Sequence, residues 1–506
     1  MCSKYLRFIV AAGVDRGTFL EWICRCQFYY LRLLERWYQN MLHSYRTQMN
    51  TVYRHTISKK EEAGFALPSI LFLITILSLA ALSVVMLHYL QRKAAMLDLA
   101  RVHALYAAQS GISEFLAQQT SLTNIAAGIS TEYSFPYNSK ATVVLSRWGC
   151  FFLIRSTGIS GALRTNAAAV VGDNPSIDFN NALVFANPNH QLVCAGNTSI
   201  TGNVTTGKGG VITGTLQGLP TPRTIPVQGK VSQQANIQLP QYRTAELLNE
   251  MSEWDKVIAS AGINGSGDST TLVLRGLPTI LQPRMIAPSV AAVSINGDVV
   301  IQGQYIRTEN PLTIAVTGSV AFSDSARIRG LIKILAAKQI TIAPNVEFDF
   351  PVVYSQSSIA LLSDQVRAQL FAPSITFNSN AAARYPSVAV SAQSQLPHPP
   401  KNQIIMENGS RLEGTMLFLA PAADTGVVII KEGAKLIGSL YSTAYITLDG
   451  SIDGTVITKE FYFYQSPTTY LGWLKSARIN RTALPKSYLV PPGFSDSPKL
   501  DILDWL

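Results

Sequence analysis

The sequence is poor in charged residues. Only 14% of its 506 residues are Asp, Glu, Lys or Arg, whereas 47% are hydrophobic; typical globular proteins have roughly 25% charged residues. The apolar content excludes a disordered chain, which lacks the residues to build a core. With so few charged residues, the protein surface must obtain its polarity from Ser, Thr, Asn and Gln, as in many exported β-rich proteins. The length corresponds to about three domains at ~150 residues each.

The sequence also lacks the usual marks of catalytic and metal sites. Beyond Leu116 its histidines are His190 and His398, far apart, and no Gly-x-Ser-x-Gly, His-Glu-x-x-His or Walker motif occurs. Cys24-Arg-Cys26 has no second pair of ligands with which to bind zinc. We therefore predict no catalytic, cofactor-binding or metal-binding residues, and expect that the protein is not an enzyme.

Cysteines are few, five in all, and three of them precede residue 30. Only Cys150 and Cys194 lie beyond the apolar segment described next. In an oxidising compartment they can form a disulfide; the alternative is two buried free thiols.

No Asp, Glu, Lys or Arg occurs from Phe65 to Gln91. About 20 apolar residues suffice for a transmembrane helix, and a cleaved signal has a shorter apolar core of roughly 7–15 residues. No Pro or Gly interrupts residues 69–110, and Ala recurs with Leu at helical spacing. The pattern predicts one helix from about Pro68 to Gln118, so that residues 65–120 form a transmembrane and continuing helix.

The basic excess lies before this helix, in residues 1–64. Lys and Arg outnumber Asp and Glu there, and Lys59 and Lys60 flank the apolar segment. Because such residues resist translocation, we predict a single-pass inner-membrane protein in contact with the lipid bilayer. Its N-terminus is expected in the cytoplasm and its C-terminal domain in the periplasm or at the surface. A nucleic-acid partner would need a basic face on a folded domain, and none is predicted.

Two β-rich regions follow. Residues 121–176 predict a small antiparallel domain, with paired strands at 141–145 and 150–154, a turn at 156–161 and a third strand at 166–171. Residues 177–480 carry a loose aliphatic-x-Gly unit between short strands. This unit favours a parallel β-solenoid with inward aliphatic residues and glycines at the corners; the alternative is a β-sandwich. The predicted inward residues include Ile200, Ile328, Leu412, Leu436 and Ile452.

An insertion at 219–290 and a C-terminal tail at 481–506 complete the predicted domains. The insertion contains a helix near 244–260 with an apolar stripe, interpreted as the cover of a solenoid flank instead of a docking element. The aromatic run 461–464, with Tyr470 and Trp473, is interpreted as a cap that closes the core, the alternative being a sugar- or partner-binding surface.

Acidic residues in the solenoid are the candidates for an enzyme that cleaves polysaccharide, because such enzymes use two carboxylates. The candidates are Asp298, Asp324, Glu347, Asp349, Asp449 and Asp453. We interpret them as ordinary turn and surface residues.

The residues around the membrane helix resemble those of type IV pilins. Lys59-Lys-Glu-Glu-Ala-Gly64 followed by Phe65-Ala-Leu-Pro is similar to a prepilin cleavage region, and Ala104–Gly111 and Ser156–Gly161 are similar to PilX-like minor pilins. The resemblance covers about residues 59–171. It implies cleavage by a prepilin peptidase between Gly64 and Phe65, and other pilin-like subunits or assembly-platform proteins as partners.

The chain departs from the pilin pattern in two ways. Ser69 stands where major pilins have Glu, which some minor pilins and tip pseudopilins also lack. The leader is long, so either translation starts near Met41 or Met49 or residues 1–64 are retained in the cytoplasm. The second half resembles bactofilin- or adhesin-type β-helices in its aliphatic-x-Gly rhythm.

These observations together predict a mainly β protein on a long N-terminal transmembrane helix. Its expected function is structural or adhesive, as a minor pilin or pseudopilin subunit of a type IV pilus or related secretion system. The alternative is a membrane-anchored β-helix protein that binds or cleaves surface polysaccharide.

Overall fold

The computed structural model describes residues 66–118, 130–175, 177–263, 271–275, 279–280, 290–303, 305–392, 401–419, 426–485, 488–494 and 498–506. The chain divides into two compact units, Met1–Lys93 and Ala94–Leu506, which are described separately. In the described residues of the first unit, the chain is helical throughout. These residues belong to α3 (Ala66–Gln118), whose bounds confirm the predicted helix. Ala and Leu predominate in α3, and a long run without Pro or Gly lets it continue unbroken.

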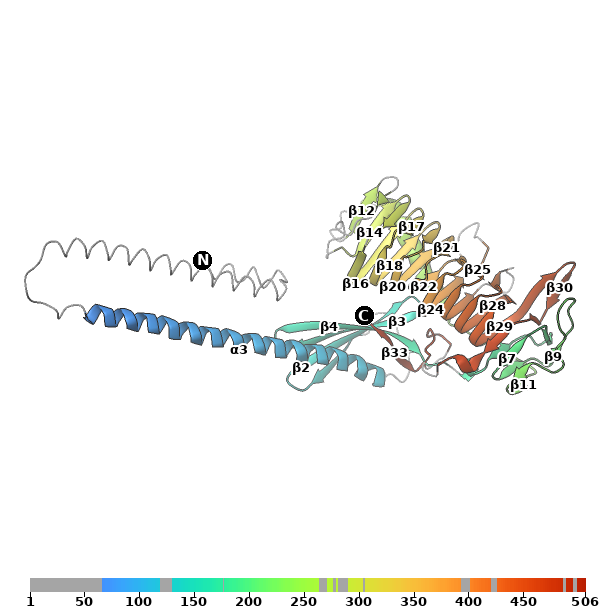
Figure 1. Cartoon of the computed structure of the whole chain (residues 1–506), viewed down its shortest axis with the longest axis horizontal. Coiled ribbons are helices and arrows are strands. Elements are labelled where there is room, and N and C mark those ends of the chain that lie inside the picture. The colour runs from blue at the N-terminus through green and yellow to red at the C-terminus, as the bar shows by residue number, and fades with distance from the viewer. Residues whose placement is uncertain are drawn as a thin grey trace, which may run out of the picture. The chain divides into compact units, whose positions relative to one another are not determined.

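A five-stranded antiparallel sheet begins the β structure of the second unit (Figure 1). Its strands are β1 (Ser130–Phe135), β2 (Ser139–Trp148), β3 (Phe151–Ser160), β4 (Leu163–Asp173) and β33 (Leu500–Trp505). The small antiparallel domain is thus present, but two predicted details are wrong. Residues 156–160 belong to β3, and the turn lies at Gly161 and Ala162. The end of the predicted tail is the fifth strand, which pairs with β4.

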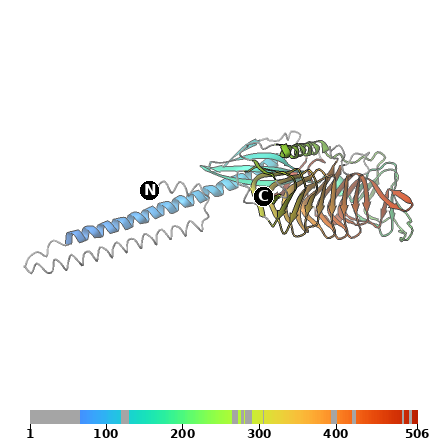
Figure 2. The same ribbon diagram turned by 90° about the horizontal axis from the view of Figure 1, so that it is seen from above.

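The rest of the second unit is a parallel β-solenoid, so the β-sandwich alternative is wrong. Its first segment comprises η1 (Ile177–Asn180), β5 (Leu183–Phe185), β6 (Leu192–Ala195), β7 (Ser199–Thr201), β8 (Val204–Thr206), β9 (Val211–Thr213), β10 (Val227–Gln228) and β11 (Val231–Gln233). α4 (Thr244–Ile263) follows, and the main stack then runs from β12 to β29, with successive coils side by side in Figure 2.

The bounds of the main stack complete the fold. Its strands are β12 (Thr271–Arg275), β13 (Thr279–Ile280), β14 (Ala292–Asn296), β15 (Val299–Gln302), β16 (Tyr305–Val316), β17 (Val320–Ser323), β18 (Arg327–Ala336), β19 (Ile340–Ile342), β20 (Glu347–Ser355), β21 (Ser358–Leu361), β22 (Gln365–Phe371), β23 (Ser374–Phe377), β24 (Ala382–Ala392), β25 (Gln403–Met406), β26 (Arg411–Leu419), β27 (Val427–Ile430), β28 (Lys435–Leu448) and β29 (Ser451–Gln465). After them come β30 (Thr468–Leu471), β31 (Trp473–Lys475), β32 (Arg478–Asn480) and η3 (Arg481–Ala483).

Ladders of buried aliphatic and aromatic side chains fill the solenoid. One ladder contains all five residues that the sequence predicted to point inward. In register, it runs Ile306, Ile328, Phe348, Val366, Ala383, Leu412, Leu436, Ile452, Ile479 and Ile200. Each of these side chains is at most 3% exposed. The predicted inward ladder is therefore confirmed.

The glycines of the aliphatic-x-Gly units also stack, because Gly414, Gly438 and Gly454 are in register. Their φ angles are +146°, +143° and +156°. A Cβ at Gly454 would lie 1.7 Å from the carbonyl oxygen of Gly438, closer than any side chain permits. Only glycine satisfies both the backbone conformation and the close approach of coils.

The chain does not build the solenoid from one end to the other. β5 pairs with β29, so the first segment stacks beyond the last coil of the main stack. The predicted insertion at 219–290 is therefore wrong in part. It does contain the predicted helix, α4. It also contains solenoid strands: β10 and β11 pair with β7 and β8, and β12 and β13 pair with β14 and β15.

One outer flank of the solenoid is covered. Leu247, Met251, Trp254 and Ile258 of α4 are buried there, in a cluster with Trp148 and Phe151 of the antiparallel sheet. This confirms that the apolar stripe of α4 faces the protein's own core. The opposite face of the sheet receives Ile112 and Phe115 of α3. Within the second unit, the sheet is thus a middle layer between residues 94–118 of α3 and the solenoid.

Candidate functional site

The part of α3 in the first unit has an apolar surface. Large side chains exposed along it include Ile70, Leu73, Leu77, Leu79, Leu82, Val85 and Met86. Thr75, Ser78 and Ser83 donate their hydroxyl hydrogens to carbonyl oxygens four residues earlier. This arrangement satisfies polar groups without water, as a hydrocarbon environment requires. By length and composition, the helix beginning at Ser69 could cross a membrane once.

The part of α3 in the second unit meets the antiparallel sheet through very small residues. A Cβ at Gly158 in β3 would lie 1.8 Å from the carbonyl oxygen of Ala104 and 2.7 Å from the backbone nitrogen of Ala108. At Gly111 in α3, a Cβ would lie 2.7 Å from that of Ala141 in β2. The small residues of the stretch 104–111 therefore form a seam of close helix–sheet contact.

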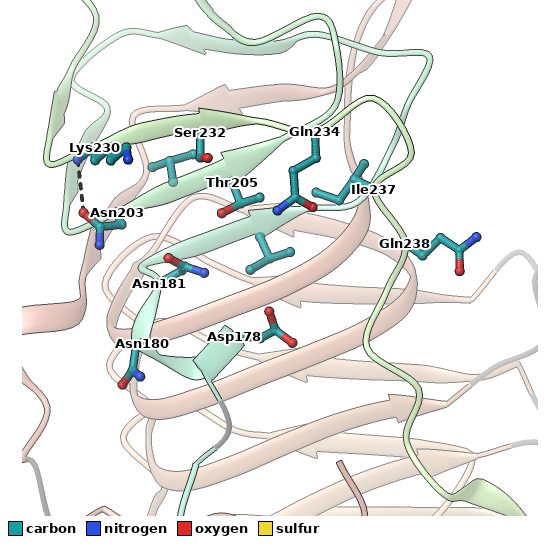
Figure 3. A pocket seen from close by; sticks show the side chains of 12 residues that line it. Asp178, Asn180, Asn181, Asn203, Thr205, Lys230, Ser232, Gln234, Ile237 and Gln238 are labelled. Atoms are coloured by element: carbon teal, nitrogen blue, oxygen red, sulfur yellow. Dashed lines mark hydrogen bonds between the residues drawn. The ribbon is translucent and has the colours of Figure 1, made fainter. Parts of the chain in front are cut away.

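A polar cleft of about 390 Å³ opens on the solenoid face formed by β5, β8 and β11 (Figure 3). The residues that line it are Asp178, Asn180, Asn181, Val184, Asn203, Val204, Thr205, Lys230, Ser232, Gln234, Ile237 and Gln238. Val184, Thr205 and Ser232 stand in register on the three strands. Asp178 comes from η1, and burial raises the pKa of its carboxyl group.

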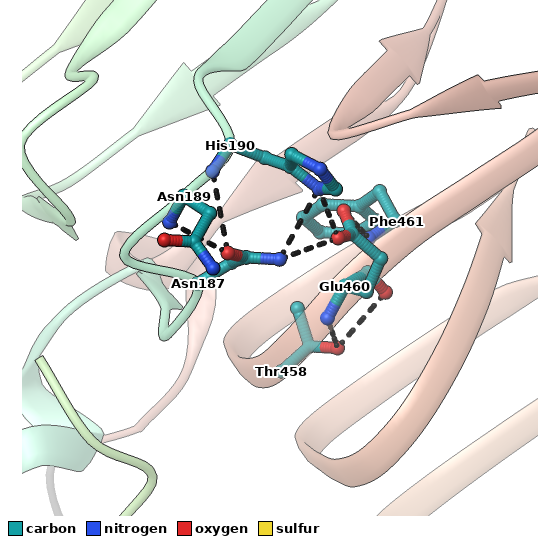
Figure 4. A network of polar contacts seen from close by, with 6 residues as sticks. All are labelled: Asn187, Asn189, His190, Thr458, Glu460 and Phe461. Carbon is teal, nitrogen blue, oxygen red and sulfur yellow. Dashed lines mark hydrogen bonds and ion pairs between the residues drawn. The ribbon is translucent and has the colours of Figure 1, made fainter. Parts of the chain in front are cut away.

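A second group of polar residues fastens the first solenoid segment to the main stack (Figure 4). Glu460 of β29 has a side chain only 7% exposed. Its Oε2 accepts a hydrogen bond from Asn187 Nδ2 at 2.6 Å and lies 2.5 Å from His190 Nδ1. Asn187 and His190 lie in the loop after β5. The network holds together two segments about 270 residues apart in sequence.

The six candidate carboxylates are spread along the stack. Asp349 pairs with Arg329 at 3.1 Å and Arg367 at 3.2 Å, and Glu347 pairs with Arg327 at 3.2 Å. These pairs occupy in-register positions on neighbouring coils, where opposite charges stabilise strand pairing.

The other carboxylates also lie at coil contacts and turns. Asp453 is 2.5 Å from the Lys435 ammonium, Asp298 accepts a hydrogen bond from the backbone nitrogen of Ser319 at 2.6 Å, and Asp324 accepts one from Gln302. Burial raises the pKa of the Asp449 carboxyl group.

A groove of about 570 Å³ adjoins the Asp349 pairs, between the solenoid and the edge of the antiparallel sheet. Arg307, Arg329 and Arg367 line it together with Trp505, which is 45% exposed. Arg367 pairs with Asp504 of β33 as well as with Asp349, so it ties the sheet to the solenoid. Two of these charges therefore already have structural roles, because Arg329 links neighbouring coils and Arg367 links the solenoid to the sheet.

The aromatic run divides between core and surface. Phe461 is fully buried and stacks on Phe185, with ring centroids 5.9 Å apart. Phe463 stacks on Tyr470 at 4.5 Å, while Tyr464 is 59% exposed on the β29–β30 hairpin. The run thus contributes to the core at this end of the stack and also projects beyond it.

Cys150 and Cys194 are both free and buried. They belong to different clusters, Cys150 to the covered flank and Cys194 to the solenoid interior, so the disulfide alternative does not occur in this structure. Burial raises the pKa of both thiols to about 12, which keeps them protonated at neutral pH.

The predicted leader 1–64 with its cleavage site at Gly64 and Phe65, and also His398, lie outside the described residues. Within the described ranges, no group of three or more His, Cys, Asp or Glu residues is placed to hold a metal ion.

No family model matches the sequence, and no curated protein matches it. Among solved structures, the chain is similar to the competence-associated pilin ComZ from Thermus thermophilus, with a TM-score of 0.19 and 11% identity over 80% of this chain and 97% of that one. The fold and the apolar helix define a class: a protein with a single apolar N-terminal helix, a small antiparallel sheet and a parallel β-solenoid.

Sequence reasoning missed the polar cleft and the Glu460 network. The cleft draws its residues from 178–184, 203–205 and 230–238, and no short motif links these stretches. His190 was noted for its isolation from His398, but its partner Glu460 is 270 residues away. Neither site leaves a local signal, because both depend on the first solenoid segment stacking on β29.

Proposed function

We propose that this protein is a membrane-anchored, pilin-like envelope protein with a structural or adhesive role and no catalytic activity. It would act as a minor subunit of a type IV pilus or a related secretion system, with the solenoid as the part presented outside the membrane. The observation that carries the proposal is α3, which is apolar and exposed in the first unit and packed against an antiparallel sheet through Gly158 in the second. In this proposal, one helix is both the membrane anchor and the helix on which the antiparallel sheet packs.

The carboxylates support a structural role over polysaccharide cleavage. Hydrolysis of a glycosidic bond needs one carboxyl group as acid and another as base or nucleophile, facing each other across the sugar. Here Glu347, Asp349 and Asp453 are paired with Arg or Lys on neighbouring coils. Such pairs stabilise the contact between coils, so these carboxylates already have a structural role.

The basic residues before the apolar segment support one membrane orientation. We expect residues 1–60 in the cytoplasm and the chain beyond Leu116 outside, because Lys and Arg resist translocation. Protease added to spheroplasts should digest the C-terminal domain and spare an N-terminal tag. A C-terminal domain that survives until the membrane is permeabilised would contradict the proposal.

Cleavage by a prepilin peptidase is expected between Gly64 and Phe65. Because glycine has no Cβ, it lets an enzyme approach the backbone closely, so Gly64→Val should block cleavage and leave a longer protein on a gel. Mass spectrometry of the mature N-terminus then identifies the cut. Ala63→Val is the matched control and should be processed normally. If wild type and Gly64→Val both retain the leader, the chain is an uncleaved anchor and not a processed pilin.

A further inference from the structure

Several side chains of the polar cleft make no hydrogen bond among the described residues. Thr205 is only 9% exposed, yet its hydroxyl makes no hydrogen bond among the described residues. The side chains of Asp178, Asn181, Ser232 and Gln234, which are half-exposed or exposed, likewise make none there. Figure 3 shows Asp178, Asn181, Thr205 and Gln234 gathered around one opening. The cleft therefore presents donors and acceptors that folding leaves unused.

Several buried polar residues elsewhere in the solenoid are hydrogen-bonded within the protein. Ser355, Ser363 and Ser391 each donate to a backbone carbonyl of a neighbouring turn at 2.6–2.7 Å. Gln369 donates to the Trp148 carbonyl at 2.9 Å and accepts from the Cys150 backbone nitrogen at 2.7 Å. The cleft side chains differ from these in that they reach solvent, so a ligand can approach their unused donors and acceptors.

The composition of the cleft indicates the chemistry of its ligand. Amide and hydroxyl groups predominate, and the two charges, on Asp178 and Lys230, cancel. Val184, Val204 and Ile237 add apolar patches among them. Hydroxyl-rich rings with apolar C–H faces match such a mixture, whereas an anion would need an excess of cations. The volume of about 390 Å³ lies within the range of roughly 300–1,000 Å³ of small-molecule sites.

We propose that this cleft binds a neutral saccharide. Thr205, Asn181 and Asp178 hydrogen-bond its hydroxyl groups, and Val184 and Ile237 contact its ring faces. The biological role of this site, as the ligand site of an adhesive envelope protein, rests on the proposed function. The position fits that role, because the cleft lies on the first solenoid segment, which forms the end of the stack beyond β29.

The test measures saccharide binding to the full chain in a zwitterionic detergent. Alkyl glucosides and maltosides are avoided, since they would compete for the site. The probes are maltotriose, N-acetylchitotriose and lactose, titrated to 10 mM by calorimetry and by saturation-transfer NMR. We expect at least one of them to bind, and inorganic phosphate at the same concentration to leave that binding unchanged.

Two substitutions remove polar groups while preserving volume, Thr205→Val and Asn181→Leu. Each should weaken binding by about tenfold or more, the factor that corresponds to ~1.4 kcal/mol for a hydrogen-bonding group. Thr341→Val, the same change on the outer surface of another coil, should bind as the wild type does. Far-UV circular dichroism and the thermal midpoint confirm that each variant is folded.

Three results would overturn the saccharide site: no binding of any probe to the folded wild type, binding that survives both substitutions, or competition by phosphate. The outcome is separate from that for the proposed function. Normal topology and Gly64 processing with no saccharide binding would remove only the ligand. Binding by a chain that fails both membrane experiments would keep the cleft and remove the pilin-like role.

Discussion

Ile340→Asp should unfold the solenoid. Ile340 is fully buried and stands in register between Val320 on the coil before and Ile359 on the coil after. An aspartate there would bury a charge with no partner, and the ladder cannot separate to admit water without breaking both strand pairings. We expect a loss of about 4 kcal/mol or more, seen as a lower urea midpoint and rapid digestion by protease.

Its neighbour Thr341 supplies the matched control. Thr341 is half-exposed on the outer surface of the same strand, and its register partners are Ala321 and Ala360, which carry no charge. Thr341→Asp should change the free energy of unfolding by no more than about 0.5 kcal/mol. Equal tolerance at positions 340 and 341 would contradict the inward ladder. Arg329 is less suitable for this comparison, because it pairs with Asp349 and its loss leaves that carboxylate with one partner fewer.

The sequence predicts those parts of the fold whose residues follow a periodic pattern within a short stretch of chain. The absence of charge from Phe65 to Gln91 and the lack of Pro and Gly defined α3 almost to the residue. The aliphatic-x-Gly unit identified Ile200, Ile328, Leu412, Leu436 and Ile452 as one inward ladder, because each unit recurs at the same bend of a coil. The stacked glycines 414, 438 and 454 are the physical reason for that rhythm.

Pairings between distant segments could not be predicted. β33 pairs with β4 more than 300 residues before it, and nothing in Leu500–Trp505 specifies that partner. β5 pairs with β29 although β12 to β28 lie between them in the chain. An edge strand accepts any partner of suitable register, so the choice depends on the whole stack. The polar cleft could not be predicted for the same reason, since it forms only when the first segment folds as the end of the solenoid.

Gly158 shows how a local pattern can mislead. Ser156-Thr-Gly-Ile-Ser-Gly161 is rich in turn-forming residues, and the sequence interpretation placed a turn there. The structure continues β3 through Gly158, and this glycine is needed for the approach of α3, not for a turn. The true turn uses Gly161, whose φ is +59°. Two glycines three residues apart therefore have different physical roles.

Gly158→Val should separate α3 from the sheet. The new Cβ would lie 1.8 Å from the Ala104 carbonyl oxygen, and both atoms belong to regular elements that cannot yield locally. Relief requires the helix to move away, which would expose Ile112 and Phe115, now buried on the sheet. We expect a loss of about 3 kcal/mol, at the upper end for overpacked sites. A cysteine at position 112, protected in the parent, should then react with maleimide, as located by mass spectrometry.

Gly161, in the turn that follows β3, provides the control. A Cβ there meets no atom within 4 Å, and asparagine tolerates its positive φ, so Gly161→Asn should change stability by no more than about 0.5 kcal/mol. The cysteine at position 112 should stay unreactive in that background. Protection of position 112 in the Gly158→Val variant as well would mean that the seam adapts to a side chain. The close contact at Gly158 would then not be required for helix docking, and the small residues of 104–111 would need another explanation, such as contact with a neighbouring subunit.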